Sequence, residues 1–140
     1  MKLKRTFISI VALMLAVCLM PTALAATWYL EDGDITVIAN ENGQSVKQGS
    51  NDAVADNDTV ITQRDSEKAT DNTITVSTEG DAKTNITIKD INIASGADSA
   101  IDVGDSNLNL TVEGENKLNA DGDSAALRVS SGDLTIDGTG

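Results

Sequence analysis

Hydrophobic and polar residues alternate with a period of two in short segments along this chain, and alternation at a helical period is nearly absent. Each segment holds two or three aliphatic residues separated by single residues, and Gly, Asp, Ser and Asn between segments predict turns. A short strand with one buried face is therefore expected at each segment. The aliphatic sets are Ile35/Val37, Ile74/Val76, Ile86/Ile88, Ile91/Ile93, Ile101/Val103, Leu108/Leu110/Val112, Leu127/Val129 and Leu134/Ile136.

The strand pattern recurs at a fixed interval. NITIKD begins at Asn85, NLTVEG at Asn109 and DLTIDG at Asp133, so like positions lie 24 residues apart twice in succession. A two-residue apolar face cannot form a core alone, but it can continue a ladder when it stacks on an equivalent strand at ~4.8 Å. We therefore predict an all-β fold, a parallel β-helix (β-solenoid) with about 24-residue turns. A small antiparallel sandwich is the alternative, but it predicts no fixed period.

The repeat also predicts the details of stacking. About three strands fit into each interval, and four to five turns are expected by dividing residues 26–140 by the period. The central threonines of the three strings, Thr87, Thr111 and Thr135, are predicted to form one outward ladder. Two extra residues in the loop 119–125 are expected to be offset by two fewer before Leu134. The less regular, polar residues 38–73 predict a looser first turn with a long loop.

Residues 1–25 are predicted to be a cleaved signal peptide. Three basic residues precede an apolar run, residues 7–20, which a proline and the small-residue sequence ALA follow. The run is shorter than the ~20 apolar residues that span a bilayer. A lipoprotein signal at Cys18 is a weaker alternative, because Val17 before it is not small. We expect a secreted or cell-surface protein whose residues 26–140 form one partial β-helix domain, without membrane contact after removal of the signal.

The charge of residues 26–140 excludes several functions. This part of the chain holds 22 acidic and seven basic residues, a formal charge of −15, with neither cysteine nor histidine. Repulsion argues against nucleic acid and anionic lipid as partners and favours cations or neutral molecules. The usual nucleophile–base pairs of enzymes are absent, and carboxylates are too numerous to indicate a catalytic pair. No catalytic residue is therefore assigned, and a non-enzymatic role is expected.

Calcium is the only cofactor that the sequence suggests. Asn119, Asp121 and Asp123 alternate in the manner of oxygen ligands in calcium loops. Serines, however, occupy the positions where an EF-hand has its glycine and its bidentate glutamate. A polar turn is the favoured interpretation of this segment, and weak cation binding by the stacked loops 98–105 and 121–123 is the alternative.

Trp28 and Tyr29 are the only aromatic residues after the signal peptide, and they are the candidate residues for carbohydrate binding. Neighbouring side chains in a strand point to opposite faces. At most one of the two rings is therefore expected to face a sugar, while the other packs on the core. The favoured interpretation is that Trp28 covers the open first turn.

Several segments carry a resemblance to a known family: WYLEDGDITVIANENGQSVKQG from Trp28, NITIKDINI, LNLTVEGENKL and the closing LTIDGTG. Together they resemble the carbohydrate-binding-domain-containing proteins secreted by Firmicutes-type bacteria. The resemblance implies a right-handed parallel β-helix with a surface or secreted location that binds a polysaccharide or cell-surface glycan. It transfers no ligand residue. The alternatives are a structural or adhesive surface segment without sugar specificity, and a remnant of a β-helix polysaccharide lyase or hydrolase.

The C-terminal turn predicts one further property. The chain stops four residues after Ile136, before a capping element, and in the family the closing motif normally opens further turns. A truncated member is therefore expected. An uncapped turn exposes unpaired backbone groups, so end-to-end self-association is expected at this turn.

Overall fold

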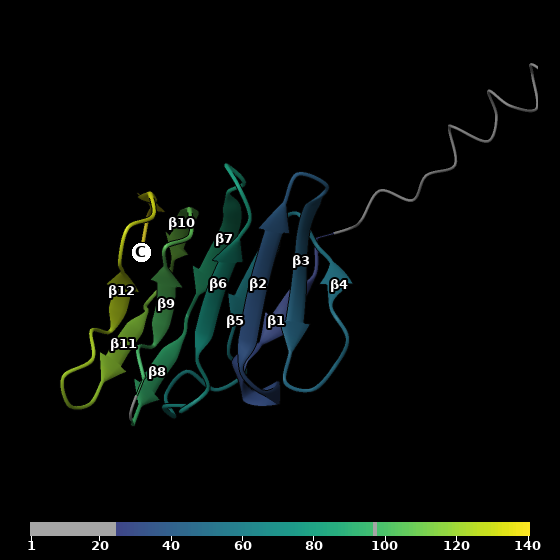
Figure 1. The fold of residues 1–140 in the computed structure, drawn as a ribbon. Coiled ribbons are helices and arrows are strands. Elements are labelled where there is room, and N and C mark those ends of the chain that lie inside the picture. The colour runs from purple at the N-terminus through teal and green to yellow at the C-terminus, as the bar shows by residue number, and fades with distance from the viewer. Residues whose placement is uncertain (1–24, 97) are drawn as a thin grey trace, which may run out of the picture.

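The computed structural model describes residues 25–96 and 98–140, so the predicted signal peptide lies outside the described residues except for Ala25. The described chain is a β-solenoid of about three turns with parallel coils of about 26 residues, which confirms the predicted fold class (Figure 1). Its elements are β1 (Thr27–Tyr29), η1 (Leu30–Asp32), β2 (Ile35–Asn40), β3 (Gly43–Gln48), β4 (Val54–Ala55), β5 (Thr59–Thr62), β6 (Ile74–Thr78), β7 (Thr84–Lys89), β8 (Asn92–Ser95), β9 (Ile101–Gly104), β10 (Leu108–Glu113), β11 (Lys117–Ala120), β12 (Leu127–Val129) and β13 (Leu134–Gly138).

Three sheets run along the solenoid axis. The first sheet has the order β1-β5-β7-β10-β13, the second has β12-β9-β6-β2-β3-β4, and the third pairs β11 with β8. Successive coils pair in parallel, as in β7 with β10 and β6 with β9. No described helix is long and apolar enough to cross a membrane.

The aliphatic residues of each alternating segment point into the solenoid. Ile86 of β7 lies beside Leu110 of β10, and Ile35 of β2 lies beside Ile74 of β6. All four side chains are buried, and they belong to one continuous apolar cluster along the axis. Burying a side chain of this size contributes about 1.5–3 kcal/mol, so stacking supplies the core that no single coil can form.

The first turn differs from the predicted long loop. After β2 the chain reverses into β3, which pairs antiparallel with β2, and then into the two-residue β4. This hairpin adds strands to the edge of the second sheet instead of advancing the coil. The expected four to five turns are for this reason reduced to about three.

Buried glutamines in β3 explain why the sequence of this hairpin predicts a loop. Gln44 and Gln48 of β3 are 6% and 7% exposed and point inward on either side of Val46. The Gln44 amide donates to Thr59 Oγ1 at 2.7 Å and to the Asn85 carbonyl at 3.0 Å, and it accepts the Asn85 N–H at 2.7 Å. A buried amide is tolerated here because its hydrogen bonds are made.

The register corrects the predicted threonine ladder. Thr87 pairs with Thr111 as expected, but Thr135 pairs with Asn109, because β13 is displaced 26 residues from β10 rather than 24. The two extra residues before β12 are thus not offset before Leu134. A shift of two residues keeps every side chain on its own face, so Leu134 still points inward.

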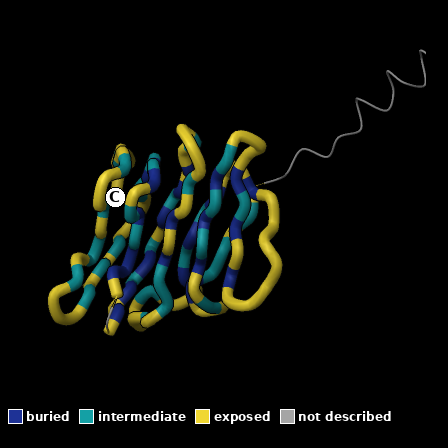
Figure 2. The backbone as a smooth tube through the Cα atoms, in the orientation of Figure 1, coloured by how far each residue is buried: buried dark blue, intermediate teal, exposed yellow. Residues whose placement is uncertain are grey.

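The two ends of the solenoid are unequal. At one end the hairpin and the segment leading to β5 cover the core, and Asp56 of that segment is completely buried. At the other end, the side chains of the last coil are intermediate or exposed (Figure 2). Ile136 of β13 is 55% exposed, whereas Ile86 and Leu110 on the same rung are 2% and 3% exposed.

Candidate functional site

A polar groove of about 470 Å³ lies at one border of the second sheet and crosses three successive coils. We call it the corner groove. Its wall comes from the start of β6, from the loop that leads into β9 and from the loop that leads into β12. It is lined by Thr73, Thr75, Asp98, Ser99, Asp102, Asp123, Ser124, Ala125 and Arg128.

Strand pairing brings the central residues of this groove together. Thr75 pairs with Asp102, and Asp102 pairs with Arg128, so the three residues form one rung across β6, β9 and β12. Each stands between two inward aliphatic residues of its strand and therefore points outward. The rung is a consequence of the same alternation that builds the core.

Asp102 and Arg128 form an ion pair within the groove. Arg128 Nη1 lies 3.2 Å from Asp102 Oδ2, and the two side chains are 56% and 35% exposed. The other carboxylate oxygen, Oδ1, accepts the Gly104 N–H at 3.0 Å. These two contacts fix the orientation of the carboxylate and leave part of each charged group open to solvent.

The chemistry of the corner groove is mixed. It offers the carboxylates of Asp98, Asp102 and Asp123, the guanidinium of Arg128, and the hydroxyls of threonine and serine side chains. Carboxylates accept hydrogen bonds, guanidinium groups donate them, and hydroxyls do both. With three negative charges against one positive charge, the lining suits a neutral ligand rich in hydroxyls and disfavours an anionic one.

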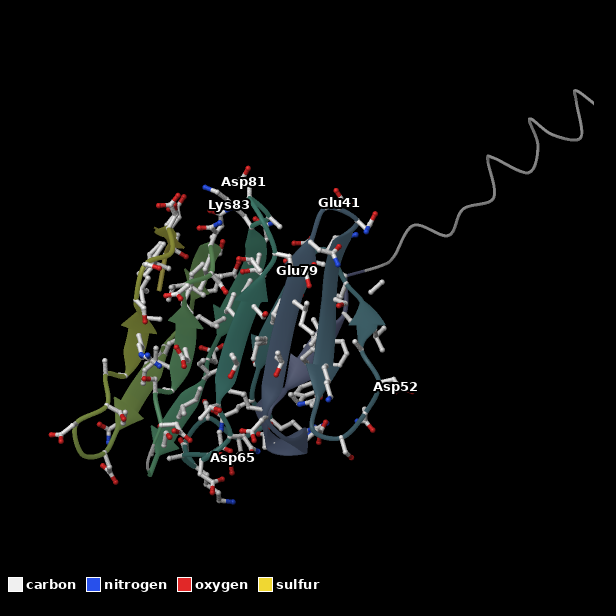
Figure 3. The ribbon with its side chains drawn as sticks, in the orientation of Figure 1. Glu41, Asp52, Asp65, Glu79, Asp81 and Lys83 are labelled. Atoms are coloured by element: carbon white, nitrogen blue, oxygen red, sulfur yellow. The ribbon has the colours of Figure 1, made fainter. Side chains whose placement is uncertain are left out.

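A second hollow of about 590 Å³ is lined by three acidic side chains and by no basic one. It lies between the turn that joins β2 to β3 and the turn that joins β6 to β7, where Figure 3 shows Glu41, Glu79 and Asp81 at one border of the sheets. Its lining consists of Asn40, Glu41, Asn42, Glu79, Gly80, Asp81 and Ala82. Because this lining lacks a basic side chain, it offers less varied contacts than the corner groove does.

The residues suggested for calcium do not converge. Asn119 is exposed on β11, the Asp121 N–H donates to the Ser95 carbonyl at 3.0 Å, and Asp123 lines the corner groove. In the described part of the chain, no group of three or more His, Cys, Asp or Glu residues is arranged to hold a metal ion. The segment forms a polar loop between β11 and β12.

The two aromatic residues point to different surroundings. Trp28 packs against the apolar core, and its Nε1–H donates to Asp56 Oδ2 at 2.8 Å. The Arg64 guanidinium lies 4.1 Å from the centre of the Tyr29 ring. The expectation that one ring packs on the core is confirmed, and the structure contains no two-ring platform at this pair.

Thr75, Asp102 and Arg128 were not predicted as site residues. The available signal was the central position of three segments, Ile-Thr-Val, Ile-Asp-Val and Leu-Arg-Val, each predicted as a strand. Stacking these segments places opposite charges side by side. No protein-family model, curated protein or solved structure matches this chain. The fold and the groove define it as a β-solenoid with a polar surface groove.

Proposed function

We propose that the chain is a non-catalytic β-solenoid module of a secreted or cell-surface protein, and that it binds a neutral polysaccharide or glycan in the corner groove. The observation that carries the proposal is the rung of Thr75, Asp102 and Arg128, which places hydrogen-bond donors and acceptors side by side over three coils. The resemblance to secreted carbohydrate-binding-domain proteins supports the same function.

The spacing of the coils favours an elongated ligand. Neighbouring strands repeat at ~4.8 Å, so equivalent polar groups recur along the axis and can contact successive units of a chain. Sugar hydroxyls donate and accept at once, which matches a lining of carboxylates, hydroxyls and one guanidinium. Hydrogen bonds to the ionised Asp102 and Arg128 would be the strongest contacts, because charge shortens and strengthens them.

Glycan-array binding by the purified protein tests the proposal. We expect retention of neutral glycans and little retention of anionic ones. Asp102→Asn keeps an oxygen for the Gly104 N–H but removes the charge, and it should weaken retention by about tenfold or more. The matched control is Glu113→Gln, which removes an exposed carboxylate from the first sheet, away from the groove.

Three results would contradict the proposal, and the first two favour another class of protein. If the unmodified protein retains no glycan, a structural or adhesive surface role is favoured. If soluble oligosaccharides are released from a polysaccharide, the module is a lyase or hydrolase. Equal binding by Asp102→Asn and Glu113→Gln would place the glycan outside the corner groove.

A further inference from the structure

The turn of the β2–β3 hairpin places an exposed asparagine directly before a glycine. Glu41 and Asn42 join β2 to β3, Gly43 is the first residue of β3, and all three residues are exposed. The turn lies at the tip of the hairpin, where Figure 3 shows Glu41. Among the asparagines of the sequence, only Asn42 precedes a glycine. The turn therefore combines an exposed side-chain amide with a following backbone nitrogen that no Cβ shields.

The fold of the hairpin requires glycine at the second position of this pair. Gly43 has φ of 130°, a conformation that side chains rarely adopt, and a Cβ there would lie 2.9 Å from Asn57 Oδ1. The same oxygen accepts the Gln44 N–H at 2.8 Å, so it is held in place. The hairpin therefore keeps the glycine, and with it the accessible nitrogen after Asn42.

The side-chain amide of Asn42 is not held by the rest of the molecule. The Asn42 N–H donates to Asn40 Oδ1 at 2.9 Å, but the Asn42 side chain has no hydrogen-bond partner in the described part of the chain. By contrast, the side-chain amides of Asn72, Asn92 and Asn107 each donate to a backbone carbonyl. The amide carbon of Asn42 can therefore turn toward the next backbone nitrogen without breaking a side-chain hydrogen bond.

We propose that Asn42 is a site of spontaneous deamidation. The Gly43 backbone nitrogen gives its proton to solvent and attacks Asn42 Cγ, a new C–N bond closes a succinimide ring, and the former amide nitrogen takes a proton and leaves as ammonia. Water then opens the ring at either of its carbonyl carbons and yields aspartate or isoaspartate. Water is the only co-reactant. This inference concerns the hairpin and does not rest on glycan binding in the corner groove.

Both products change the surroundings of the turn. Each adds a carboxylate to the hollow of about 590 Å³ that Glu41, Glu79 and Asp81 already line, and like charges repel one another across it. Isoaspartate also lengthens the main chain by one methylene between β2 and β3. This extra length shifts the start of β3, where the buried amide of Gln44 is hydrogen-bonded to β5 and β7. The isoaspartate product should therefore loosen the hairpin more than aspartate does.

Peptide mapping by mass spectrometry tests the proposal after the folded protein is incubated under mildly alkaline conditions. We expect Asn42 to deamidate at least about tenfold faster than the exposed Asn51 and Asn119, because Asp52 and Ala120 place a Cβ beside the attacking nitrogen. The matched control is Asn42→Gln, which keeps the amide but sets its carbon one methylene farther away. This variant should lose the rapid mass gain in the peptide that contains residue 42, and circular dichroism verifies that it folds.

The same incubation in urea supplies the decisive comparison. If Asn42 keeps its amide in the folded protein and loses it only in the unfolded chain, the hairpin protects the pair and the proposal is wrong. Equal rates at Asn42 and Asn51 in the folded protein would also overturn it, and so would an unchanged mass gain in Asn42→Gln.

The stability of the products tests the effect on the hairpin. Asn42→Asp carries the new charge without lengthening the main chain, so it separates the two consequences of deamidation. We expect the isoaspartate form, isolated by ion exchange from aged protein, to melt several degrees below Asn42→Asp. Equal melting temperatures would show that the hairpin tolerates the added methylene and would overturn this part of the proposal.

Discussion

The carboxylate of Asp90 occupies the space that a side chain at Gly114 of the next coil would need. Asp90 lies directly after β7, and Gly114 lies at the equivalent position after β10. Asp90 Oδ1 accepts the Glu115 N–H at 3.0 Å, so the carboxylate fastens one coil to the next. Gly114 has φ of 68°, a conformation that also favours glycine.

Replacing Gly114 should reveal this contact. Gly114→Ala pays about 1–2 kcal/mol for the left-handed conformation, and it must also displace Asp90, which costs about a further 1–2 kcal/mol with the lost hydrogen bond. Urea denaturation measures the change in unfolding free energy. The control is Gly80→Ala, because Gly80 has φ of 61° with open space around it and should show only the conformational cost.

A second substitution separates the steric cost from the conformational one. Combining Gly114→Ala with Asp90→Gly should cost less than the sum of the single variants, because the alanine then has room. Asp90 itself has φ of 50°, which glycine adopts freely. Strictly additive costs would show that the two positions do not compete for space.

Gln44 should stabilise the end of the solenoid that the β2–β3 hairpin covers. Gln44→Leu keeps a similar size but removes the hydrogen bonds that the Gln44 amide makes with the Thr59 hydroxyl and with both backbone groups of Asn85. We expect a loss of about 1–3 kcal/mol in unfolding free energy, since buried polar groups without hydrogen bonds carry their desolvation cost. Ser45→Ala, on the outer face of the same strand, should change stability by less than about 0.5 kcal/mol. A Gln44→Leu variant of unchanged stability would contradict this role.

These glutamines mark where sequence reasoning failed. The strands after residue 73 could be predicted because Ile, Val and Leu alternate with polar residues, and only apolar side chains were expected inside. The hairpin of β2 and β3 was not predicted because Gln44 and Gln48 occupy its inward positions. Their burial depends on hydrogen-bond partners as distant in sequence as Asn85. Distant hydrogen bonds leave no local pattern.

The corner groove shows the same limit in another form. The two extra residues in the loop 119–125 already predicted that Arg128 lies 26 residues after its equivalent Asp102, and this register is confirmed. The sequence did not indicate that the outward side chains of this rung line a groove together with the preceding loops. Strand alternation predicted that the rings of Trp28 and Tyr29 point to different surroundings, but it did not decide which ring packs on the core.

Calcium should have no effect on stability. A ligand that binds only the folded state raises the melting temperature by an amount that grows with the logarithm of its concentration above the dissociation constant, and no group of acidic side chains in the described chain is arranged to hold a metal. We therefore expect the same melting temperature with millimolar calcium and with a chelator. A rise with calcium that Asp123→Asn removes would contradict this and support the loop 119–123 as a weak site.

Acid should weaken the contact between η1 and the loop that follows β5. Two hydrogen bonds from Arg64, at 2.8 and 2.7 Å, lower the pKa of Asp32 below its ordinary value. The unfolded chain therefore takes up a proton on this carboxylate at higher pH than the folded chain does. The stabilisation is present above the unfolded pKa of about 3.9 and is lost as pH falls through the lower folded value.

Denaturation between about pH 7 and about pH 3 checks this linkage. Asp32→Asn should lose stability at neutral pH and show a smaller additional loss in acid than the unmodified protein. Asp71→Asn removes an exposed carboxylate in the same part of the molecule, and this control should keep the original acid dependence of stability. Parallel pH profiles for the unmodified protein and Asp32→Asn would refute the assignment.

The covered end has a consequence for biosynthesis. A ribosome makes this end first, and every later strand of the first sheet pairs with one already made: β7 with β5, β10 with β7, and β13 with β10. Each emerging coil therefore meets a finished template and closes only a short loop to reach it. The solenoid of the nascent chain therefore grows in one direction, and its unpaired strand edges are always those of the newest coil.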